Sequence, residues 1–338
     1  MPQNRAPVQP TQLSERVVGE TPDGRRLVEF TFTAANGLSA RWLNHGATLT
    51  GITLPDGTEV VAGFEDPEDY LGNHPYVGCT IGPVANRIAG GRFAVDEQDY
   101  AVAPNEGANL LHSGPHGYHT QLWDHHIVDG NRLRLSLFSR DQDRGWPSDS
   151  WAFLDVSLSE ATLDIAMRAH VSRPSPVNMT LHTYFNPAGT FGAPVDDFTL
   201  WSPATAYTPV NAERIPTESS TPAGRTAFDL SDYEPIGARE IDHNFLVPGS
   251  GQRLLATVTD GERFIYVESD APGLQVFTGH TVTDSEVMAA RGAVALEPQS
   301  PPDLVNFDPE AALSDVDQPF MRRITYRFAG PGLPELSA

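Results

Sequence analysis

The chain has 338 residues, and its 44 acidic side chains against 22 basic ones give a formal net charge of −22 at pH 7. This charge excludes the basic surface that binds nucleic acid or an anionic membrane, so neither partner is expected. Hydrophobic residues make up 39 % of the chain and charged residues 20 %, which is the composition of a soluble globular protein rather than a disordered one.

The basic residues are all arginine. The absence of lysine from the sequence excludes Schiff-base chemistry, pyridoxal phosphate and a P-loop. Cys79 is the one cysteine, so the chain cannot form an internal disulfide or a four-cysteine zinc site, and we expect a small buried apolar residue there.

The ends of the chain are polar. Residues 1–12 lack an apolar run, and no later stretch approaches the roughly 18 apolar residues of a membrane span. We therefore expect a cytoplasmic protein, a monomer or homodimer, with a flexible N-terminal tail at 1–12, a single domain at 13–330 and a C-terminal tail at 331–338.

The predicted elements are strands joined by turns. Glycine and proline, 29 of each, recur at short intervals along the chain. Hydrophobic and polar residues alternate in Leu27–Thr33, Leu133–Leu137, Leu163–Met167 and Phe264–Val267. This alternation predicts strands with one buried face and one solvent-exposed face. Without a heptad or fixed-period repeat, this pattern predicts an all-β protein, a large antiparallel β-sandwich. Spacing alone leaves open whether there is one sandwich or two.

Polar residues in strand-like or glycine-rich contexts are the candidate functional residues, because a polar side chain in an apolar run needs a reason for its burial. They are spread over more than two hundred positions, and an all-β fold can still bring them to one face of a sheet. The candidates are Asn86 with Arg87, His112, His182, Asp242–Asn244 and Glu297–Gln299.

Glu297 and His182 are the candidates for proton transfer. Glu297 follows the apolar stretch Gly292–Leu296, where a carboxyl group is either a partly buried base with a raised pKa or one end of an ion pair. His182 is either a hydrogen-bonded core residue or an acid or base working near neutral pH. Arg87 is either a solvated side chain or a donor to several hydroxyl groups.

A cluster of histidines suggests a metal site. Glycine and proline residues between them exclude the helix that their spacing would need, so we expect no metal there. The cluster consists of His112, His116, His119, His125 and His126. Dinucleotide-binding, serine-hydrolase and zinc-protease motifs are also absent from the sequence.

Taken in order, a series of segments resembles the aldose 1-epimerase (galactose mutarotase) family from about Leu43 to Pro309. Ala85–Phe93 is similar to the most recognisable signature of that family at almost every position. The series as a whole is more specific than any one member. The other segments are Asn44–Leu49, Asn109–Gly114, Val177–Asn186, Tyr207–Val210 with Ile215–Thr217, Ile241–Phe245, Leu274–Gly279 and Leu296–Gln299.

The resemblance implies a β-supersandwich fold and interconversion of the α and β anomers of a free sugar without a cofactor or metal. Carried onto this chain, it makes Glu297 the general base that takes the proton of the C1 hydroxyl and His182 the general acid that protonates the ring oxygen. It also implies that Arg87, His112 and Asp242 hold sugar hydroxyls, with Asn86 a weaker candidate.

The sequence departs from the family pattern at several places: Gly82–Val84, Ser113, Tyr118 with His119, and His280. We expect these positions to touch the sugar-binding rim, so galactose, glucose, xylose and arabinose all stay candidate substrates. Three other functions stay open. They are a hexose-6-phosphate 1-epimerase, a non-catalytic sugar-binding protein of the same fold, and a metal-dependent isomerase or lyase built on the histidine cluster.

Overall fold

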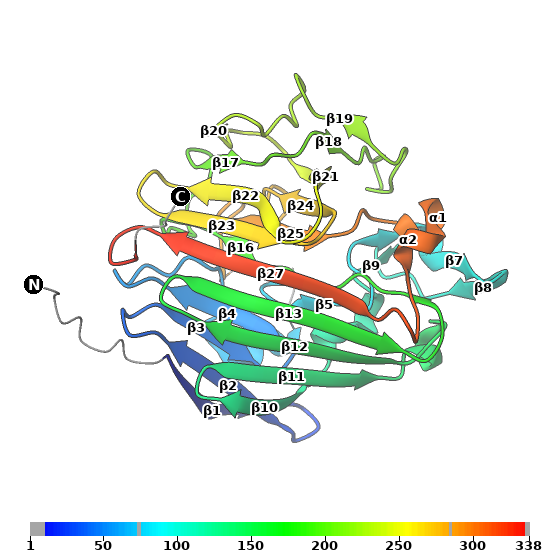
Figure 1. Cartoon of the computed structure of the whole chain (residues 1–338), viewed down its shortest axis with the longest axis horizontal. Helices are drawn as coiled ribbons and strands as arrows, with labels where there is room; N and C mark the ends of the chain where they lie inside the picture. Colours follow the sequence, from blue (N-terminus) through cyan, green and yellow to red (C-terminus); the bar gives the residue numbers. More distant parts are fainter. Residues whose placement is uncertain (1–10, 73–75, 284–285, 335–338) are drawn as a thin grey trace, which may run out of the picture.

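Antiparallel strands are the main regular secondary structure of the chain, as Figure 1 shows. The computed structural model describes residues 11–72, 76–283 and 286–334. Within them the α-helices are short: α1 covers Leu304–Phe307 and α2 covers Pro309–Ala312. None of the described helices has the length and apolar character needed to cross a membrane.

The first four strands form a meander. They pair in the order β1-β2-β3-β4, each with the next. Their bounds are β1 Gln12–Glu20, β2 Arg26–Thr33, β3 Ser39–Leu43 and β4 Thr48–Thr53.

A nine-stranded sheet runs across the molecule in the order β10-β11-β12-β13-β27-β23-β22-β17-β20. The C-terminal strand β27 lies between β13 and β23, so the end of the chain joins two parts of this sheet (Figure 1). Its strands are β10 Asp124–Asp129, β11 Arg132–Ser139, β12 Ser150–Leu158, β13 Thr162–Val171, β17 Thr199–Trp201, β20 Glu234–Pro235, β22 Arg253–Thr259, β23 Phe264–Ser269 and β27 Phe320–Ala329.

A six-stranded sheet has the order β16-β25-β24-β21-β18-β19. The strands are β16 Tyr184–Phe185, β18 Ala206–Tyr207, β19 Thr221–Pro222, β21 Asp242–Leu246, β24 Gly273–Phe277 and β25 Val294–Gln299. Two-stranded pairs complete the described strands: β5 Thr80–Ile81 with β15 Thr180–Leu181, β6 Arg87–Ile88 with β9 Leu110–Leu111, β7 Arg92–Val95 with β8 Gln98–Ala101, and β14 Ser175–Pro176 with β26 Leu313–Ser314. Short 3-10 turns lie at Pro67–Gly72, Ala89–Gly91, Gly114–His116, Tyr118–Thr120 and Asp141–Arg144.

The four strands predicted from alternation are confirmed as parts of β2, β11, β13 and β23. In β13 every second side chain is buried, which is the pattern of a strand with one face on the core. The all-β, antiparallel class is confirmed with them.

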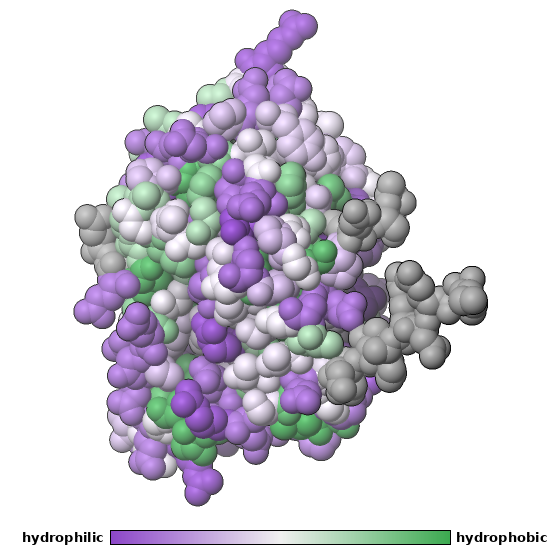
Figure 2. All heavy atoms as spheres, turned by 90° about the vertical axis from the view of Figure 1, so that its left-hand side faces the viewer, coloured by the Kyte–Doolittle hydropathy of each residue, from purple (hydrophilic) through white to green (hydrophobic). Residues whose placement is uncertain are grey.

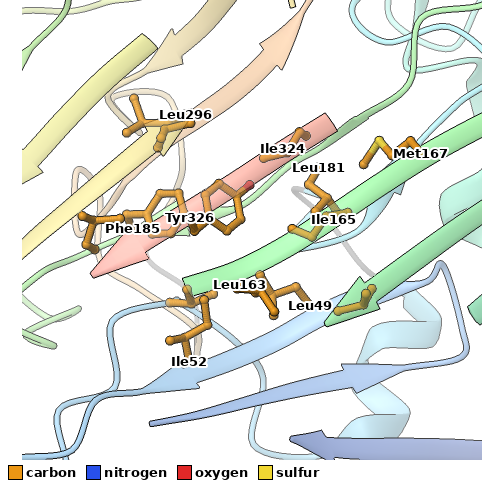
Figure 3. Packing of buried hydrophobic residues seen from close by; sticks show 14 of the residues in the cluster. Leu49, Ile52, Leu163, Ile165, Met167, Leu181, Phe185, Leu296, Ile324 and Tyr326 are labelled. Carbon is orange, nitrogen blue, oxygen red and sulfur yellow. The ribbon is translucent and has the colours of Figure 1, made fainter. Parts of the chain in front are cut away.

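One large hydrophobic cluster joins the three sheets. It contains residues of β2 and β4, of β12, β13 and β27, and of β24 and β25. Figure 3 shows Ile165 of β13 beside Ile324 of β27, with Leu49 and Ile52 of β4 on one side and Leu296 of β25 on the other. Because Ile165 and Ile324 are also cross-strand partners, this contact ties the C-terminal strand to the centre of the core.

Ordered structure extends slightly beyond the expected domain limits. Gln12 is the first residue of β1, and Leu333 packs against the main cluster. The rest of the expected tails, 1–10 and 335–338, lies outside the described residues. On the face shown in Figure 2, hydrophilic residues predominate and hydrophobic ones form separate small patches, in keeping with the excess of carboxylates.

Replacing Ile165 by alanine is expected to lower the free energy of unfolding by about 2–5 kcal/mol, because it leaves a cavity in a fully buried contact. Urea denaturation measures this loss. Ser157→Ala on the outward face of β12 is the matched control and should change stability by less than about 0.5 kcal/mol. Equal effects of the two variants would contradict the placement of Ile165.

Candidate active site

A polar cavity lies on the face of the six-stranded sheet opposite the core. Alternation along β25 places Leu296 in the core and Glu297 on the other face, and along β24 it separates Val276 from Gln275 in the same way. Gln275 stands directly opposite Glu297 in the register. The cavity above these residues has a volume of ≈ 370 Å³.

The six residues to which the family resemblance assigns roles all line this cavity. They come from strands and turns that are far apart along the chain, and the sheets bring them together. They are Asn86, Arg87, His112, His182, Asp242 and Glu297.

Asn86 and His112 hold each other in place. Both have left-handed backbones, with φ of 66° and 50°. The backbone N–H of Asn86 donates to Nδ1 of His112 at 3.1 Å, and the N–H of His112 donates to the carbonyl of Asn86 at 3.0 Å. Since Nδ1 accepts a hydrogen bond, the neutral imidazole of His112 carries its proton on Nε2, where it can donate to a ligand.

His182 is anchored through its backbone just after β15. Its N–H donates to the carbonyl of Cys79 at 3.0 Å, and its carbonyl accepts from Gly78 at 2.9 Å. Cys79 is fully buried, as expected. The rings of Tyr76 and Tyr184 lie 6.0 and 4.9 Å from the imidazole, centroid to centroid, so His182 is enclosed by aromatic side chains.

His182 and Glu297 form a buried pair. Nε2 of His182 lies 3.5 Å from Oε1 of Glu297, and the two residues are 5 % and 2 % exposed. Burial raises the pKa of Glu297 well above its ordinary value, and the negative charge of Asp242 adds to the effect. Burial also lowers the pKa of His182 to about 4. Both groups therefore favour their neutral forms, and together they hold one proton that can lie on either partner.

His112 adds a third buried group, and burial lowers its pKa well below the ordinary value for histidine. Possible ligand atoms of His112, His182 and Glu297 lie within 4.8 Å of one another, so these three residues could hold a metal ion. The same atoms are placed to donate to and accept from the hydroxyl groups of a sugar.

The more exposed wall of the cavity contains two arginine–carboxylate pairs. Arg87 donates to both oxygens of Glu106, at 2.5 Å from Nε and 2.8 Å from Nη2. Asp242 accepts from Nη1 of Arg214 and, at 2.7 Å, from Nε2 of Gln275. These bonds fix the direction of both Arg87 and Asp242.

Sequence reasoning missed Gln275, Glu106, Arg214 and Tyr76 as parts of this site. Gln275 carried a signal, since it is a polar residue within the apolar strand Gly273–Phe277. The other three carried none, because they lie in loops where polar and aromatic residues are common.

The histidine cluster does not gather at one point. His112 and His119 both pack against Tyr76, with ring centroids 4.6 and 5.0 Å away, whereas His125 is exposed on β10 and lies 3.7 Å from Glu15. The site that a metal could use combines His112 with two residues from outside the cluster.

The positions at which the sequence departs from the family pattern mostly avoid the cavity wall, contrary to expectation. The hydroxyl of Ser113 donates to the carbonyl of Val84 and accepts from its N–H, both at 2.8 Å, so it braces a turn. His119 is buried behind Tyr76. His280 contacts Arg214, beyond Asp242, and is the departure that reaches the rim.

The model of the family described as aldose 1-epimerase matches residues 29–313. The chain belongs to the aldose 1-epimerase family. It is therefore related to isomerases, and the resemblance of its motifs to that family is confirmed.

Relatives match along most of the chain. Galactose mutarotase of Homo sapiens is 34 % identical over 315 residues, which cover 87 % of this chain and 92 % of that protein. Aldose 1-epimerase of Escherichia coli K12 is 31 % identical over 312 residues, covering 84 % and 89 %. The crystal structure of galactose 1-epimerase from Lactobacillus acidophilus NCFM superposes with a TM-score of 0.86 at 25 % identity, covering 95 % of this chain and 99 % of that one.

Glu297→Gln is expected to stabilise this epimerase-family protein by an amount that grows with pH. A carboxyl group whose pKa is raised by folding favours the folded state below its unfolded pKa of about 4.3 and loses that contribution as the pH rises, whereas glutamine does not ionise. The melting temperature of the variant relative to wild type should rise from about pH 4 to about pH 8 in scanning calorimetry.

The exposed carboxylate of Glu97 supplies the control. Glu97→Gln should change the melting temperature little at either pH. A difference between Glu297→Gln and wild type that stays constant with pH would contradict the buried, raised-pKa state of Glu297.

Proposed function

We propose that this protein interconverts the α and β anomers of a free aldose, with Glu297 and His182 moving the protons. The observation that carries the proposal is the buried contact of 3.5 Å between Nε2 of His182 and Oε1 of Glu297 at the floor of a cavity lined with hydroxyl-binding groups. Family membership supports the reaction type.

The reaction needs one base and one acid. In the ion-pair form, the Glu297 carboxylate takes the proton of the C1 hydroxyl while the His182 imidazolium donates its proton to the ring oxygen, and the C1–O5 bond breaks. Rotation about the C1–C2 bond turns the aldehyde over. The ring hydroxyl then attacks the other face of C1 as His182 takes its proton back, and Glu297 returns its proton to O1. No atom or charge is gained or lost over the cycle.

The shared proton explains how these pKa shifts suit the reaction. In the empty site burial favours the carboxylic acid and the neutral imidazole. Transfer of that one proton between the two groups gives the reactive ion pair without any exchange with solvent. A sugar hydroxyl that donates to Glu297, and a ring oxygen that accepts from His182, both favour the ion-pair form.

The charge of the cavity supports a neutral sugar. Arg87 is matched by Glu106 and Arg214 by Asp242, so neither guanidinium is left to balance a phosphate dianion. We therefore favour a free aldose such as galactose or glucose over a hexose 6-phosphate. We also infer a cytoplasmic protein, monomeric or homodimeric, that acts in hexose metabolism as a single domain over residues 13–330. The shared core of residues from Val28 to Phe328 supports the single domain.

The deciding experiment is polarimetry of freshly dissolved α-D-galactose, α-D-glucose and α-D-xylose. Wild-type protein should speed the decay of optical rotation in the presence of EDTA, and Glu297→Gln and His182→Asn should each lose about 10²–10⁴-fold in kcat, the usual contribution of a general acid or base. Glu97→Gln should keep full activity.

Each contrary result has a distinct meaning. Full activity in Glu297→Gln would overturn the base assignment. Loss of activity in EDTA that zinc restores would assign the reaction to a metal held by His112, His182 and Glu297. Sugar binding without any acceleration would identify a binding protein.

The pH dependence of kcat/KM is expected to show a broad plateau. Below the His182 pKa of about 4 the pair holds two protons and cannot accept the C1 proton. Above the raised pKa of Glu297 the pair holds none and cannot protonate the ring oxygen. Initial rates at low sugar concentration measure this profile, and an acid limb centred near the ordinary histidine pKa of about 6.5 would contradict it.

A further inference from the structure

Arg214 is a charged residue of the cavity mouth that the mechanism above does not use. It lies in the loop between β18 and β19, and its Nη1 donates to Oδ2 of Asp242. Its Nη2 lies 3.5 Å from Nε2 of His280, and His280 in turn contacts the hydroxyl of Thr278 at 3.2 Å. The guanidinium is therefore held beside Asp242, the carboxylate that the family resemblance implies holds a sugar hydroxyl.

The bonds of Asp242 leave room for a ligand. Oδ1 accepts from Gln275 and Oδ2 accepts from Arg214, so each oxygen keeps a lone pair that a sugar hydroxyl can reach. Arg214 has five N–H groups, of which these contacts occupy two at most. An acceptor and a donor thus stand side by side, which matches two neighbouring hydroxyl groups of a sugar.

A second arginine–carboxylate pair, Arg87 with Glu106, also borders the mouth. The cleft continues outward between the two arginine–carboxylate pairs as a space of ≈ 420 Å³. Across it, Nδ2 of Asn109 donates to Oε2 of Glu213 at 3.2 Å. This bond joins the loop at 105–109 to the loop at 211–214, so Arg214 is carried on a segment fixed to both sides of the mouth.

We propose that Arg214 is a substrate-binding residue that donates a hydrogen bond to a hydroxyl at the non-anomeric end of the sugar, next to Asp242. The proposal rests on the proposed function, since it places C1 at Glu297 and His182 and the rest of the ring toward the mouth. The partner is a neutral hydroxyl group, because the charge of Arg214 is already matched by Asp242.

Arg214→Leu tests this proposal in the full-length protein with D-galactose and D-glucose as substrates. Loss of a charged donor should raise KM about tenfold, while kcat changes by less than about threefold because the contact is made in the ground state and the transition state alike. The pH profile should keep its shape, since Glu297 and His182 are untouched. Arg214→Lys keeps the charge without the planar fork and should give an intermediate KM.

Deoxy sugars identify the contact. We expect one of the 2-, 3-, 4- and 6-deoxy derivatives of the better substrate to show the same KM with wild type and Arg214→Leu, because that sugar lacks the hydroxyl that Arg214 binds. Arg225→Leu is the matched control. Arg225 is exposed and has the same left-handed backbone, with φ of 65° against 61°, and its guanidinium has no ion pair among the described residues.

Three outcomes would count against the proposal or its basis. An unchanged KM in Arg214→Leu overturns it. The same rise in KM for every deoxy sugar also overturns it, because no single hydroxyl group would then depend on Arg214. If wild type accelerates no sugar, the proposed function fails, and calorimetric titration of the same sugars into wild type and Arg214→Leu still decides whether Arg214 binds them.

Discussion

The burial of one carboxyl group is the constraint on which the site depends. Glu297 lies on β25, between β16 and β24, with Leu296 beside it in the main core. A slip of one residue in this strand would exchange the two side chains, so the packing of the core sets the position of the carboxyl group. Removal from water then raises the pKa of Glu297, and the same enclosure lowers that of His182.

The polar groups of this cavity differ in how deeply they are buried. At the floor, His182 and Glu297 are almost completely buried and share a proton, which suits them to move protons without charging the site. Nearer the mouth, Arg87 and Asp242 each form an ion pair with a residue of opposite charge. In the proposed mechanism the deep pair responds to the reacting bonds, whereas the outer pairs offer fixed donors and acceptors to hydroxyl groups.

Much of the fold and part of the site could be predicted. Alternation identified β2, β11, β13 and β23, because a strand with one buried face shows its period directly in the sequence. The motif series singled out six of the residues that line the cavity, although their roles stay predictions. Glu106 and Arg214 escaped notice, since charged residues in loops have no local signature and their partners are 19 and 28 residues away in the chain. Gln275 was missed although it is a polar residue in an apolar strand, and its partner Asp242 is 33 residues away.

By itself the sequence determined the strand periodicity, the family and the chemical types available, because these depend on local pattern and residue identity. Tertiary structure decided which of those residues meet. It separated His125 from His112 and gave the hydroxyl of Ser113 a hydrogen bond to the carbonyl of Val84. It also placed Nε2 of His182 3.5 Å from Oε1 of Glu297. The physical reason is that pKa shifts and hydrogen-bond partners arise from burial and from contacts between distant strands, which only the packed sheets create.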